Sequence, residues 1–523
     1  MSTASRWIKD AIFYQIYPAT FCDANGDGIG DLKGIASKID YIKDLGVDAV
    51  WLNPIYESPF KDGGYDISDY YKIDKRFGTM EDLEELIRVF HKNGVKVILD
   101  MVFGHTSDKH KWFRKSANKT RNEYSDYYIW SENNFQSYDH KLIYGLYYRD
   151  GGYYMNYYAS QPGLNFGFRD PDQTWQMHYT DDRLTPLREE LLNVMRFYLD
   201  KGADGFRFDM AGHMVKGETW DDVSENGIAG HVWFWDKLIT PLRNEYKDKV
   251  YIAEWMCPEN SIAKCNFDLD FMSHDTPAYN DLVRNEPNTN LVREIELGDN
   301  YFSPNGKGTM KNFVKYIESL YPLTDGKGYI CSPSGNHDEI RISTFKSPNI
   351  TKAIFAFLLT YKNVAFIYYG DEIGITHNFG VSKDGGSVRT GTRTPMQWTN
   401  GKNRGFSEKR TTYLPTNGEK GCSVESQLKD ENSILNTVKT LIKIRKAHPC
   451  LNAENDQKFI ETDYPAVYER TDGKETVRVY INPSDREILR TCEYKEILLS
   501  QNAEIVGNSV TLKGQSFVIL KIK

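Results

Sequence analysis

The sequence has no block of charge of one sign and no long apolar run. Its 65 Lys and Arg residues are balanced by 73 Asp and Glu residues, for a net charge of −8. Without a basic cluster, nucleic acid and anionic membranes are not expected as partners. The longest apolar stretch, from Ala353 to Tyr361, is far shorter than the about 20 residues of a membrane-spanning helix.

Cysteine is scarce and gives no metal signature. The seven cysteines are scattered, odd in number and without the short spacings of a metal site. This pattern is typical of reduced thiols in a reducing compartment. The N-terminal residues also lack the apolar core of a signal peptide. Together these features predict a cytoplasmic protein. They leave the oligomeric state open and are compatible with a monomer.

A helical pattern that ends in glycine and runs into an apolar strand recurs along the chain, at Lys43–Val47, Lys92–Val95 and Lys201–Ala203. Eight strand candidates alternate with helical patterns. They are Ala11–Pro18, Asp48–Asn53, Lys96–Val102, Gly205–Met210, Val250–Glu254, Phe267–Phe271, Tyr329–Ser332 and Val364–Tyr369. Eight such units predict an α/β fold, a closed (β/α)8 TIM barrel. An open doubly wound sheet is less favoured, because no Gly-rich phosphate loop follows the first strand.

Two long stretches and a change of pattern divide the chain. Residues 105–170 are rich in Tyr, Asn, Ser and Asp without a helical period, which predicts a small domain inserted after the third strand. The barrel then takes residues 1–104 and 171–448 and ends with an amphipathic helix. Residues 449–523 change to short alternating β runs, which predict a C-terminal antiparallel β-sandwich domain.

Three carboxylates stand where predicted strands end: Asp209, Glu254 and Asp338. The ends of parallel barrel strands gather at one face, so these residues can converge on one pocket. Arg207 lies two positions before Asp209 and therefore leaves the strand on the same face. Its cation would keep Asp209 ionised, as a nucleophile requires. Each motif alone could equally be a structural ion pair, and His337 alone a structural histidine.

With these motifs together, the chain resembles the α-amylase superfamily, glycoside hydrolase family 13, and above all its oligo-α-glucosidase branch. The resemblance covers nearly the whole chain. It is carried by Tyr-Gln-Ile-Tyr-Pro from Tyr14, Gly-Tyr-Asp-Ile-Ser-Asp-Tyr from Gly64, Gly-Phe-Arg-Phe-Asp from Gly205, Asn-His-Asp from Asn336, Tyr-Tyr-Gly-Asp-Glu-Ile-Gly from Tyr368 and Arg-Thr-Pro-Met-Gln-Trp from Arg393.

The resemblance implies a role for each matching residue. Asp209 would be the nucleophile, Glu254 the general acid and base, and Asp338 the carboxylate that stabilises the transition state. A retaining mechanism needs the first two about 5–5.5 Å apart. The resemblance further implies that the cleaved sugar is contacted by His105, Arg207 and His337 and stacks on Tyr65.

The depth of the pocket depends on two further residues. Asp66 and Arg389 resemble a pair that, in exo-acting members, binds the terminal sugar and closes the next subsite. A bidentate Arg–carboxylate pair would grip adjacent hydroxyls and block a longer chain. The alternative for both residues is a surface or interface salt bridge.

One loop has the beginning of a calcium-binding pattern. Oxygen ligands could come from Asp23, Asn25, Asp27, the carbonyl of Ile29, and Asp31, with Gly28 allowing a sharp turn. The resemblance supports a structural calcium ion here. The alternative is an Asp-capped turn before a helix that begins at Leu32. No organic cofactor is expected.

The sequence therefore predicts a retaining exo-acting α-glucosidase that hydrolyses terminal α-linked glucose from disaccharides and short oligosaccharides. A transglycosylase or isomerase acting on sucrose, trehalose or maltose is the alternative, and an endo-α-amylase a weaker one. Linkage preference and chain length stay open, because Met210 after the nucleophile matches neither the α-1,4 nor the α-1,6 pattern. Gly104 and Gly163 also depart from residues common in the family.

Overall fold

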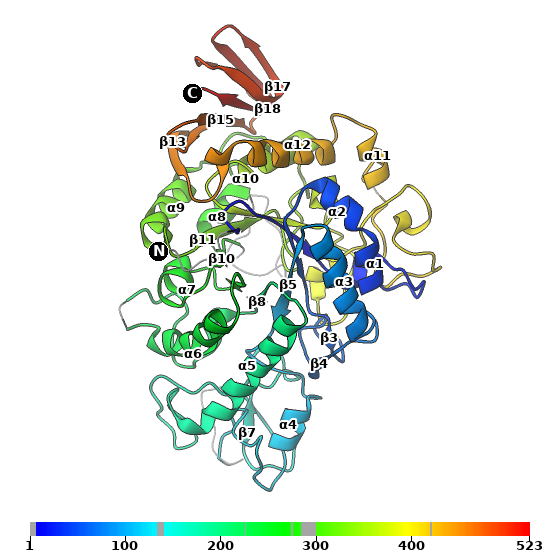
Figure 1. Ribbon diagram of the computed structural model, residues 1–523, viewed down its shortest axis with the longest axis vertical. Coiled ribbons are helices and arrows are strands. Elements are labelled where there is room, and N and C mark those ends of the chain that lie inside the picture. The colour runs from blue at the N-terminus through cyan, green and yellow to red at the C-terminus, as the bar shows by residue number, and fades with distance from the viewer. Residues whose placement is uncertain (1–6, 133–140, 225, 274–275, 284–299, 419–420) are drawn as a thin grey trace.

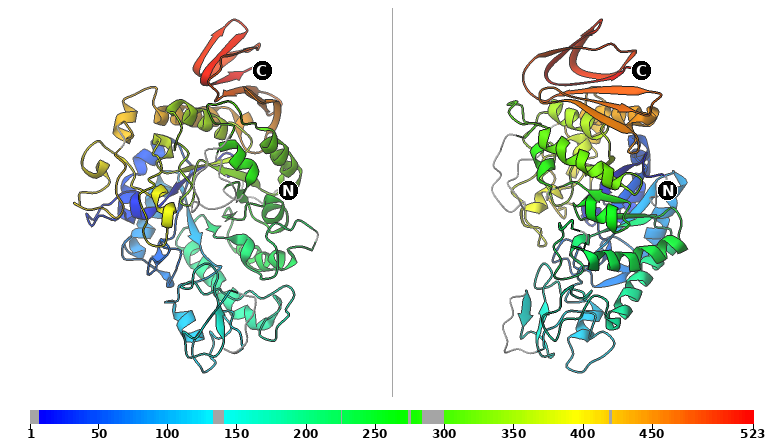
Figure 2. Two further views of the ribbon diagram at one scale, coloured as in Figure 1. Left: turned by 180° about the vertical axis from the view of Figure 1, so that it is seen from behind. Right: turned by 90° about the vertical axis from the view of Figure 1, so that its left-hand side faces the viewer.

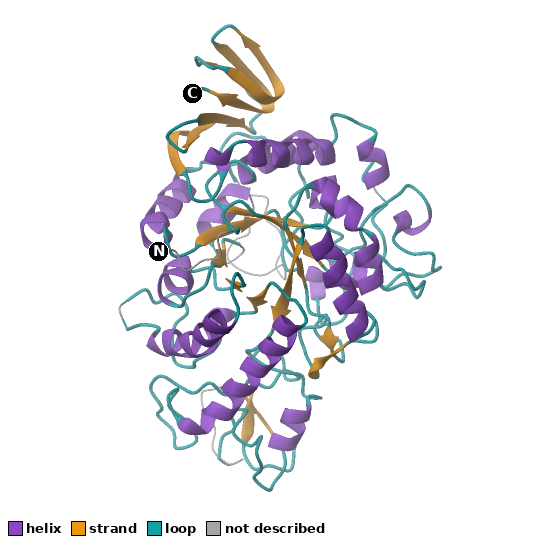
Figure 3. Ribbon diagram, viewed as in Figure 1, coloured by secondary structure: helices purple, strands orange, loops and turns teal. Residues whose placement is uncertain are grey.

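A computed structural model describes residues 7–132, 141–224, 226–273, 276–283, 300–418 and 421–523. Residues 1–6 and 133–140, which the predicted domain ranges include, lie outside the described residues. Eight parallel strands close into a barrel around which the helices are arranged (Figures 1 and 3). The strands are β1 (Ile12–Ile16), β2 (Ala49–Leu52), β5 (Lys96–Met101), β8 (Gly205–Phe208), β9 (Val250–Ala253), β10 (Leu269–Phe271), β11 (Tyr329–Pro333) and β12 (Val364–Tyr368). The predicted barrel is confirmed.

The helices of the barrel have amphipathic sequences, and two of them end at a glycine that adopts a left-handed conformation. After α2, Gly46 has φ 94°, and after α5, Gly202 has φ 102°, so the chain reverses into the next strand. The helices that surround the barrel are α1 (Leu32–Ser37), α2 (Ile39–Leu45), α3 (Met80–Lys92), α5 (Thr185–Asp200), α6 (Ala229–Glu245), α7 (Pro258–Lys264), α8 (Pro277–Val283), α9 (Lys311–Thr324), α10 (Pro348–Leu358), α11 (Val424–Leu428) and α12 (Ile434–Ala447).

The inside of the barrel is filled with large apolar side chains. The ring of Phe13 stacks on that of Phe366 with centroids 4.4 Å apart, and Phe271 meets Phe366 edge-on at 5.0 Å. Trp51 lies in the same buried cluster. The barrel is therefore a packed core, and the site must lie above it, at the strand ends.

Between β5 and α5 the chain leaves the barrel and forms a separate lobe. It contains α4 (Lys111–Ser116) and the antiparallel strands β6 (Leu142–Tyr144) and β7 (Gly152–Tyr154) around the buried rings of Phe113, Trp130 and Tyr153. A short ribbon of β3 (Tyr56–Glu57) and β4 (Asp69–Ile73) precedes it. The lobe lies at one end of the molecule (Figures 1 and 2), within the stretch where an insertion is expected. The boundaries assigned to that domain stay a prediction.

The opposite end of the molecule carries an antiparallel sheet of six strands (Figure 2). Residues alternate between its faces, so Tyr468 and Ile519 join the barrel core while their neighbours Val467 and Val518 form a second small core. The strands are β13 (Asp456–Thr462), β14 (Ala466–Thr471), β15 (Thr476–Asn482), β16 (Ile488–Thr491), β17 (Glu496–Val506) and β18 (Ser509–Lys521). The predicted antiparallel C-terminal domain is confirmed. In the part of the chain that is described, no helix has the length and apolar character to cross a membrane.

Candidate active site

The three carboxylates lie where β8, β9 and the loop after β11 reach one end of the barrel. Asp209 directly follows β8, and its backbone N–H donates to the carbonyl of Met101 at 2.9 Å. Glu254 directly follows β9, and its N–H donates to the carbonyl of Phe208 at 3.0 Å. The parallel ladder therefore continues through both residues and fixes their backbones. Asp338 lies in the loop after β11, which ends at Pro333.

One buried guanidinium joins the first two carboxylates. Arg207 is 1% exposed; its Nη1 lies 2.8 Å from Oδ1 of Asp100 and 3.0 Å from Oδ1 of Asp209. Its Nη2 lies 2.6 Å from Oε1 of Glu254. Arg207 thus joins carboxylates from β5, β8 and β9 in one cluster, and it lies on the same face as Asp209, as their spacing predicts.

Opposing influences act on the carboxylate of Asp209. Burial, followed by the charge of Glu254, raises the pKa of Asp209 well above its ordinary value, although Arg207 opposes the rise. The guanidinium of Arg207 is shared with Asp100 and Glu254. Arg207 therefore lies beside Asp209 and favours its ionised form, as expected, and the ionisation of Asp209 stays a prediction.

The backbone after Asp209 also contacts Glu254. Met210 has φ 44°, in the left-handed region that costs a non-glycine residue roughly 1–2 kcal/mol. In that conformation its N–H donates to Oε2 of Glu254 at 2.8 Å. Both carboxylate oxygens of Glu254 are thus held, one by Arg207 and one by Met210, and the strained turn orients the proposed proton donor.

Asp338 is held by two arginines from a long excursion of the chain, the segment that connects β12 to α11. Nη1 of Arg389 lies 2.9 Å and Nη2 of Arg393 lies 2.7 Å from the same Oδ1 of Asp338. Nε2 of His337 lies 3.2 Å from Oδ2. Burial lowers the pKa of His337 well below its ordinary value, so this imidazole is neutral and contributes no charge. The two arginines therefore provide the positive charge that faces Asp338.

Tyr65, His105 and His337 lie together beside this cluster. The ring of Tyr65 stacks on that of His337 with centroids 5.1 Å apart and an interplanar angle of 3°. The Tyr65 hydroxyl donates to Oδ2 of Asp100 at 2.9 Å. Nε2 of His105 lies 3.1 Å from the carbonyl of Tyr65, and burial lowers the pKa of His105 to about 4. The structure thus brings these residues to one site, while their contacts with a sugar stay a prediction.

The predicted pair of Asp66 and Arg389 is wrong. Asp66 is fully buried and accepts hydrogen bonds from Oγ of Ser58 at 2.9 Å and from the backbone N–H groups of Lys61 and Asp62 at 2.9 and 3.2 Å. It stabilises its own loop and has no contact with Arg389 among the described interactions.

Asp62 takes the place expected for Asp66. Nη2 of Arg389 lies 3.3 Å from Oδ1 of Asp62. The intervening Gly63 and Gly64 have φ of 56° and 105°, so the chain reverses between the two aspartates. One carboxylate therefore points to Arg389 and the other back into the loop. Burial raises the pKa of Asp62, whereas Arg389 opposes that rise.

The inserted lobe supplies further contacts that sequence reasoning missed. Nε2 of Gln161 donates to Oδ2 of Asp62 at 2.8 Å, and Nδ2 of Asn156 lies 3.0 Å from Nδ1 of His105. The Tyr158 hydroxyl lies 3.4 Å from Nη2 of Arg389. Asp62 could have been found as the first acid of Asp-Gly-Gly-Tyr-Asp, four residues before Asp66. Asn156 and Tyr158 lie in a stretch without periodicity and carried no signal.

The proposed calcium loop has the arrangement of a capped turn. Asp23 accepts from the N–H groups of Gly26 at 2.7 Å and Gly28 at 2.8 Å. Asp31 caps α1, with Oδ1 accepting from Gly34 N–H at 2.7 Å. Among the described residues, no three His, Cys, Asp or Glu side chains are grouped to hold a metal ion. These contacts are those of a capped turn, and calcium binding by this loop stays a prediction. Besides Asp23 and Asp31, the ligands that the sequence predicts are Asn25, Asp27 and Ile29.

Chelation tests the calcium prediction. If the loop binds calcium, excess chelator should lower the melting temperature, because a ligand of the native state stabilises that state by mass action. Turnover measured below the melting transition should change little, since the loop makes none of the contacts described for the carboxylate cluster. Differential scanning fluorimetry with and without chelator measures the effect. Asp27→Ala should abolish it, and Asp40→Ala on the exposed face of α2 should not. Identical melting curves would favour the capped turn.

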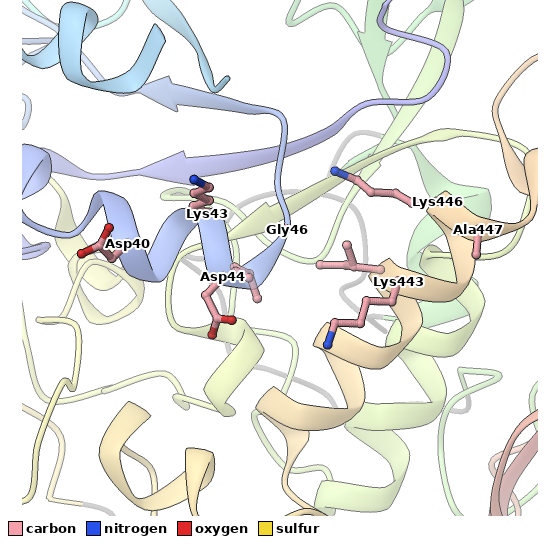
Figure 4. A pocket seen from close by; sticks show the side chains of 9 residues that line it. Asp40, Lys43, Asp44, Gly46, Lys443, Lys446 and Ala447 are labelled. Atoms are coloured by element: carbon pink, nitrogen blue, oxygen red, sulfur yellow. The ribbon is translucent and has the colours of Figure 1, made fainter. Parts of the chain in front are cut away.

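A separate open groove lies away from the carboxylates, between α2 and α12 (Figure 4). Asp40, Lys43, Asp44 and Lys443 line it. Lys446, which also lines it, pairs with Asp48 at the beginning of β2, so the groove faces the N-terminal ends of the strands. It contains none of the predicted site residues.

Comparison with known proteins shows the family to which the chain belongs. Residues 15–454 match the α-amylase catalytic domain family. The chain belongs to the α-amylase family. Among its relatives in that family is an oligo-1,6-glucosidase of Parageobacillus thermoglucosidasius, 32% identical with 94% of each chain covered. Alpha-amylase 3 of Dictyoglomus thermophilum is 31% identical, with 99% of this chain and 94% of its own covered.

Solved structures of family members superpose along the whole chain. A mutant of the trehalulose synthase MutB in complex with glucose has a TM-score of 0.83 at 27% identity, covering 99% of this chain and 100% of its own. A mutant isomaltulose synthase of Erwinia rhapontici in complex with D-glucose has a TM-score of 0.81 at 26% identity, with complete coverage of both. The comparisons thus agree on an enzyme fold of the α-amylase family along nearly the whole chain.

Proposed function

We propose that the protein is a retaining exo-acting α-glucosidase that hydrolyses terminal α-linked glucose from disaccharides and short oligosaccharides. The observation that carries the proposal is the cluster in which Arg207 bridges Asp209 and Glu254. One guanidinium can contact both carboxylates only if they are near each other, which suits the separation of about 5–5.5 Å in retaining enzymes.

The reaction would proceed in two steps. Asp209 attacks the anomeric carbon and forms a covalent bond to the glucosyl unit, while Glu254 donates its proton to the oxygen of the departing sugar. Glu254, now ionised, then takes a proton from the water that attacks the same carbon and releases Asp209. Two inversions give net retention. Asp338, held by Arg389 and Arg393, is placed to accept hydrogen bonds from sugar hydroxyls.

Exo action is supported by Arg389, which contacts Asp338 and Asp62 at once. From the inserted lobe, Gln161 contacts Asp62 and Tyr158 contacts Arg389. The loop that carries Asp62, the excursion that carries Arg389 and the inserted lobe therefore meet beside Asp338. A longer glucan would have to pass through this buried network, so the pocket would accept a chain end only.

Loss of Arg389 tests the closed pocket. Arg389→Ala removes a charged contact and leaves Asp62 without its cation, so specificity for disaccharides should fall more than tenfold, because such losses cost about 2–5 kcal/mol. The native enzyme should release glucose units singly from the non-reducing end and act poorly on starch. Product analysis over time measures both.

Two variants control this experiment. Asp62→Asn should match the loss in Arg389→Ala, whereas Arg410→Ala, at an exposed arginine of the same excursion, should leave specificity unchanged. A native enzyme that lowers the viscosity of starch before releasing much glucose would contradict the closed pocket. That result would favour an endo-α-amylase.

A second candidate is transfer of the glucosyl unit to another sugar in the same pocket. It is favoured by the whole-chain similarity to the trehalulose synthase and isomaltulose synthase structures. Both reactions share the covalent step and differ in whether water or a sugar accepts the glucosyl unit. Incubation with sucrose, followed by NMR, separates them: glucose and fructose indicate hydrolysis, and a rearranged disaccharide indicates transfer. Maltose, isomaltose and trehalose under the same conditions reveal the linkage preference.

We also propose the binding partners and the cellular location of the enzyme. Small sugars are the only partners we propose, with neither nucleic acid nor membrane. All seven cysteines are buried free thiols, which supports a cytoplasmic location, because a reducing compartment keeps thiols free.

A further inference from the structure

Another buried carboxylate, that of Asp270, lies at the same end of the barrel and has no role in the mechanism above. Asp270 is on β10, the strand next to β9, where it pairs with Ala253, the residue before Glu254. It is fully buried. No cation contacts it among the described interactions, so it is not one half of an ion pair there. Its environment consists of hydrogen-bond donors.

Three of those donors are consecutive backbone N–H groups that follow Glu254. Oδ1 of Asp270 accepts from Trp255 and Met256 at 3.0 Å each, and Oδ2 accepts from Cys257 at 3.0 Å. Successive N–H groups that converge in this way form a concave anion-binding nest. Here the anion in the nest is a side chain of the protein itself.

The nest requires strained backbone. Met256 has φ 59°, a left-handed conformation that an unbranched non-glycine residue adopts at a cost of about 1–3 kcal/mol. Such a conformation persists only when the surroundings hold it. Both carboxylate oxygens of Asp270 accept hydrogen bonds from this turn and so stabilise the conformation. Ser261 on α7 in turn donates to Oδ2 of Asp270 at 2.6 Å. The turn that begins directly after Glu254 is thus stabilised by one carboxylate.

The ionised form of Asp270 is needed for this arrangement. Burial raises the pKa of Asp270 to about 7, while the hydrogen bonds from Ser261, Trp255, Met256 and Cys257 oppose the rise because they favour the charged form. An amide in its place would offer one acceptor and one donor. Its NH2 group would face N–H donors, and part of the nest would open.

We propose that Asp270 is a positioning residue for Glu254. It fixes the turn after Glu254 and thereby the direction in which the acid and base group points, without contacting substrate. The inference rests on the proposed function, in which Glu254 transfers the proton. The purely structural alternative is that Asp270 stabilises the barrel end and affects every step equally.

Leaving-group dependence separates these two roles. In Asp270→Asn, kcat for a disaccharide, whose leaving oxygen must be protonated, should fall at least tenfold more than kcat for α-glucosyl fluoride, whose leaving group needs no proton. KM should change little. Added azide should raise turnover of the fluoride and yield α-glucosyl azide, because azide attacks the glucosyl-enzyme without a general base.

Asp268→Asn is the matched control. Asp268 is equally buried, lies two residues earlier, and accepts from Tyr251 N–H at 2.8 Å and from Nη2 of Arg243 at 2.9 Å, remote from the turn after Glu254. This control should lower the melting temperature and change both substrates by the same factor. Equal losses on both substrates in Asp270→Asn, or no effect of azide, would overturn the positioning role.

Two further variants keep the test decisive. If Asp270→Asn does not fold, Ser261→Ala is the substitute, because it removes one donor to the carboxylate. Its kcat should again fall more for the disaccharide than for the fluoride, with a smaller difference between the two. Equal losses on both substrates would overturn the inference. Glu254→Gln reports on the proposed function itself. If it shows leaving-group dependence and the Asp270 and Ser261 variants do not, only the positioning role fails. If the native enzyme cleaves neither substrate, the proposed function fails and the inference with it.

Discussion

Asp209→Asn should reduce turnover of any α-glucoside by more than about 10⁴-fold while the protein stays folded. The reason is that an amide cannot form the covalent bond to the anomeric carbon, and that bond is the first of the two steps. Steady-state rates on maltose or isomaltose, with circular dichroism of the same sample, measure the effect.

The stereochemistry of azide rescue makes the assignment specific. In Asp209→Asn, azide can enter the space of the lost nucleophile and react from that face, so the product should be β-glucosyl azide. Asp204→Asn, at the opposite end of β8, is the matched control: this buried aspartate loses its contacts with the more exposed His91 and Lys96, which should lower stability with turnover near native. Near-native turnover in Asp209→Asn would remove this residue from the nucleophile role.

Glu254→Gln should lower turnover of disaccharides by about 10²–10⁴-fold and turnover of α-glucosyl fluoride much less, since general acid catalysis matters only where the leaving group needs a proton. Azide should now give α-glucosyl azide, the anomer opposite to that expected from Asp209→Asn. The two variants thus assign both carboxylates by product configuration, measured by NMR.

Much of the barrel could be predicted because its signals are local. A buried strand is recognised from a short apolar run, and Gly46 or Gly202 marks the end of the preceding helix. The convergence of Asp209 and Glu254 followed from topology alone, since parallel strands share one end. Both residues follow β8 and β9 directly, where the ladder leaves little freedom.

Side-chain direction in loops could not be predicted in the same way. Asp62 and Asp66 are four residues apart and chemically identical, and only the reversal at Gly63 and Gly64 decides which one meets Arg389. Asp270 lay inside the predicted strand Phe267–Phe271, and its position there gave it no role. Its role depends on N–H groups of the loop after β9, which the segment around Asp270 does not encode.

The sequence by itself therefore determined the barrel, the C-terminal antiparallel domain, the family, and the carboxylates at the strand ends, because each depends on periodicity or on a short motif. Tertiary structure alone decided the sharing of Arg207 among Asp100, Asp209 and Glu254, the choice of Asp62 over Asp66, and the contacts of Asn156 and Gln161 from the inserted lobe. Those properties depend on burial and on distances between segments far apart in the chain, and such distances exist only after folding.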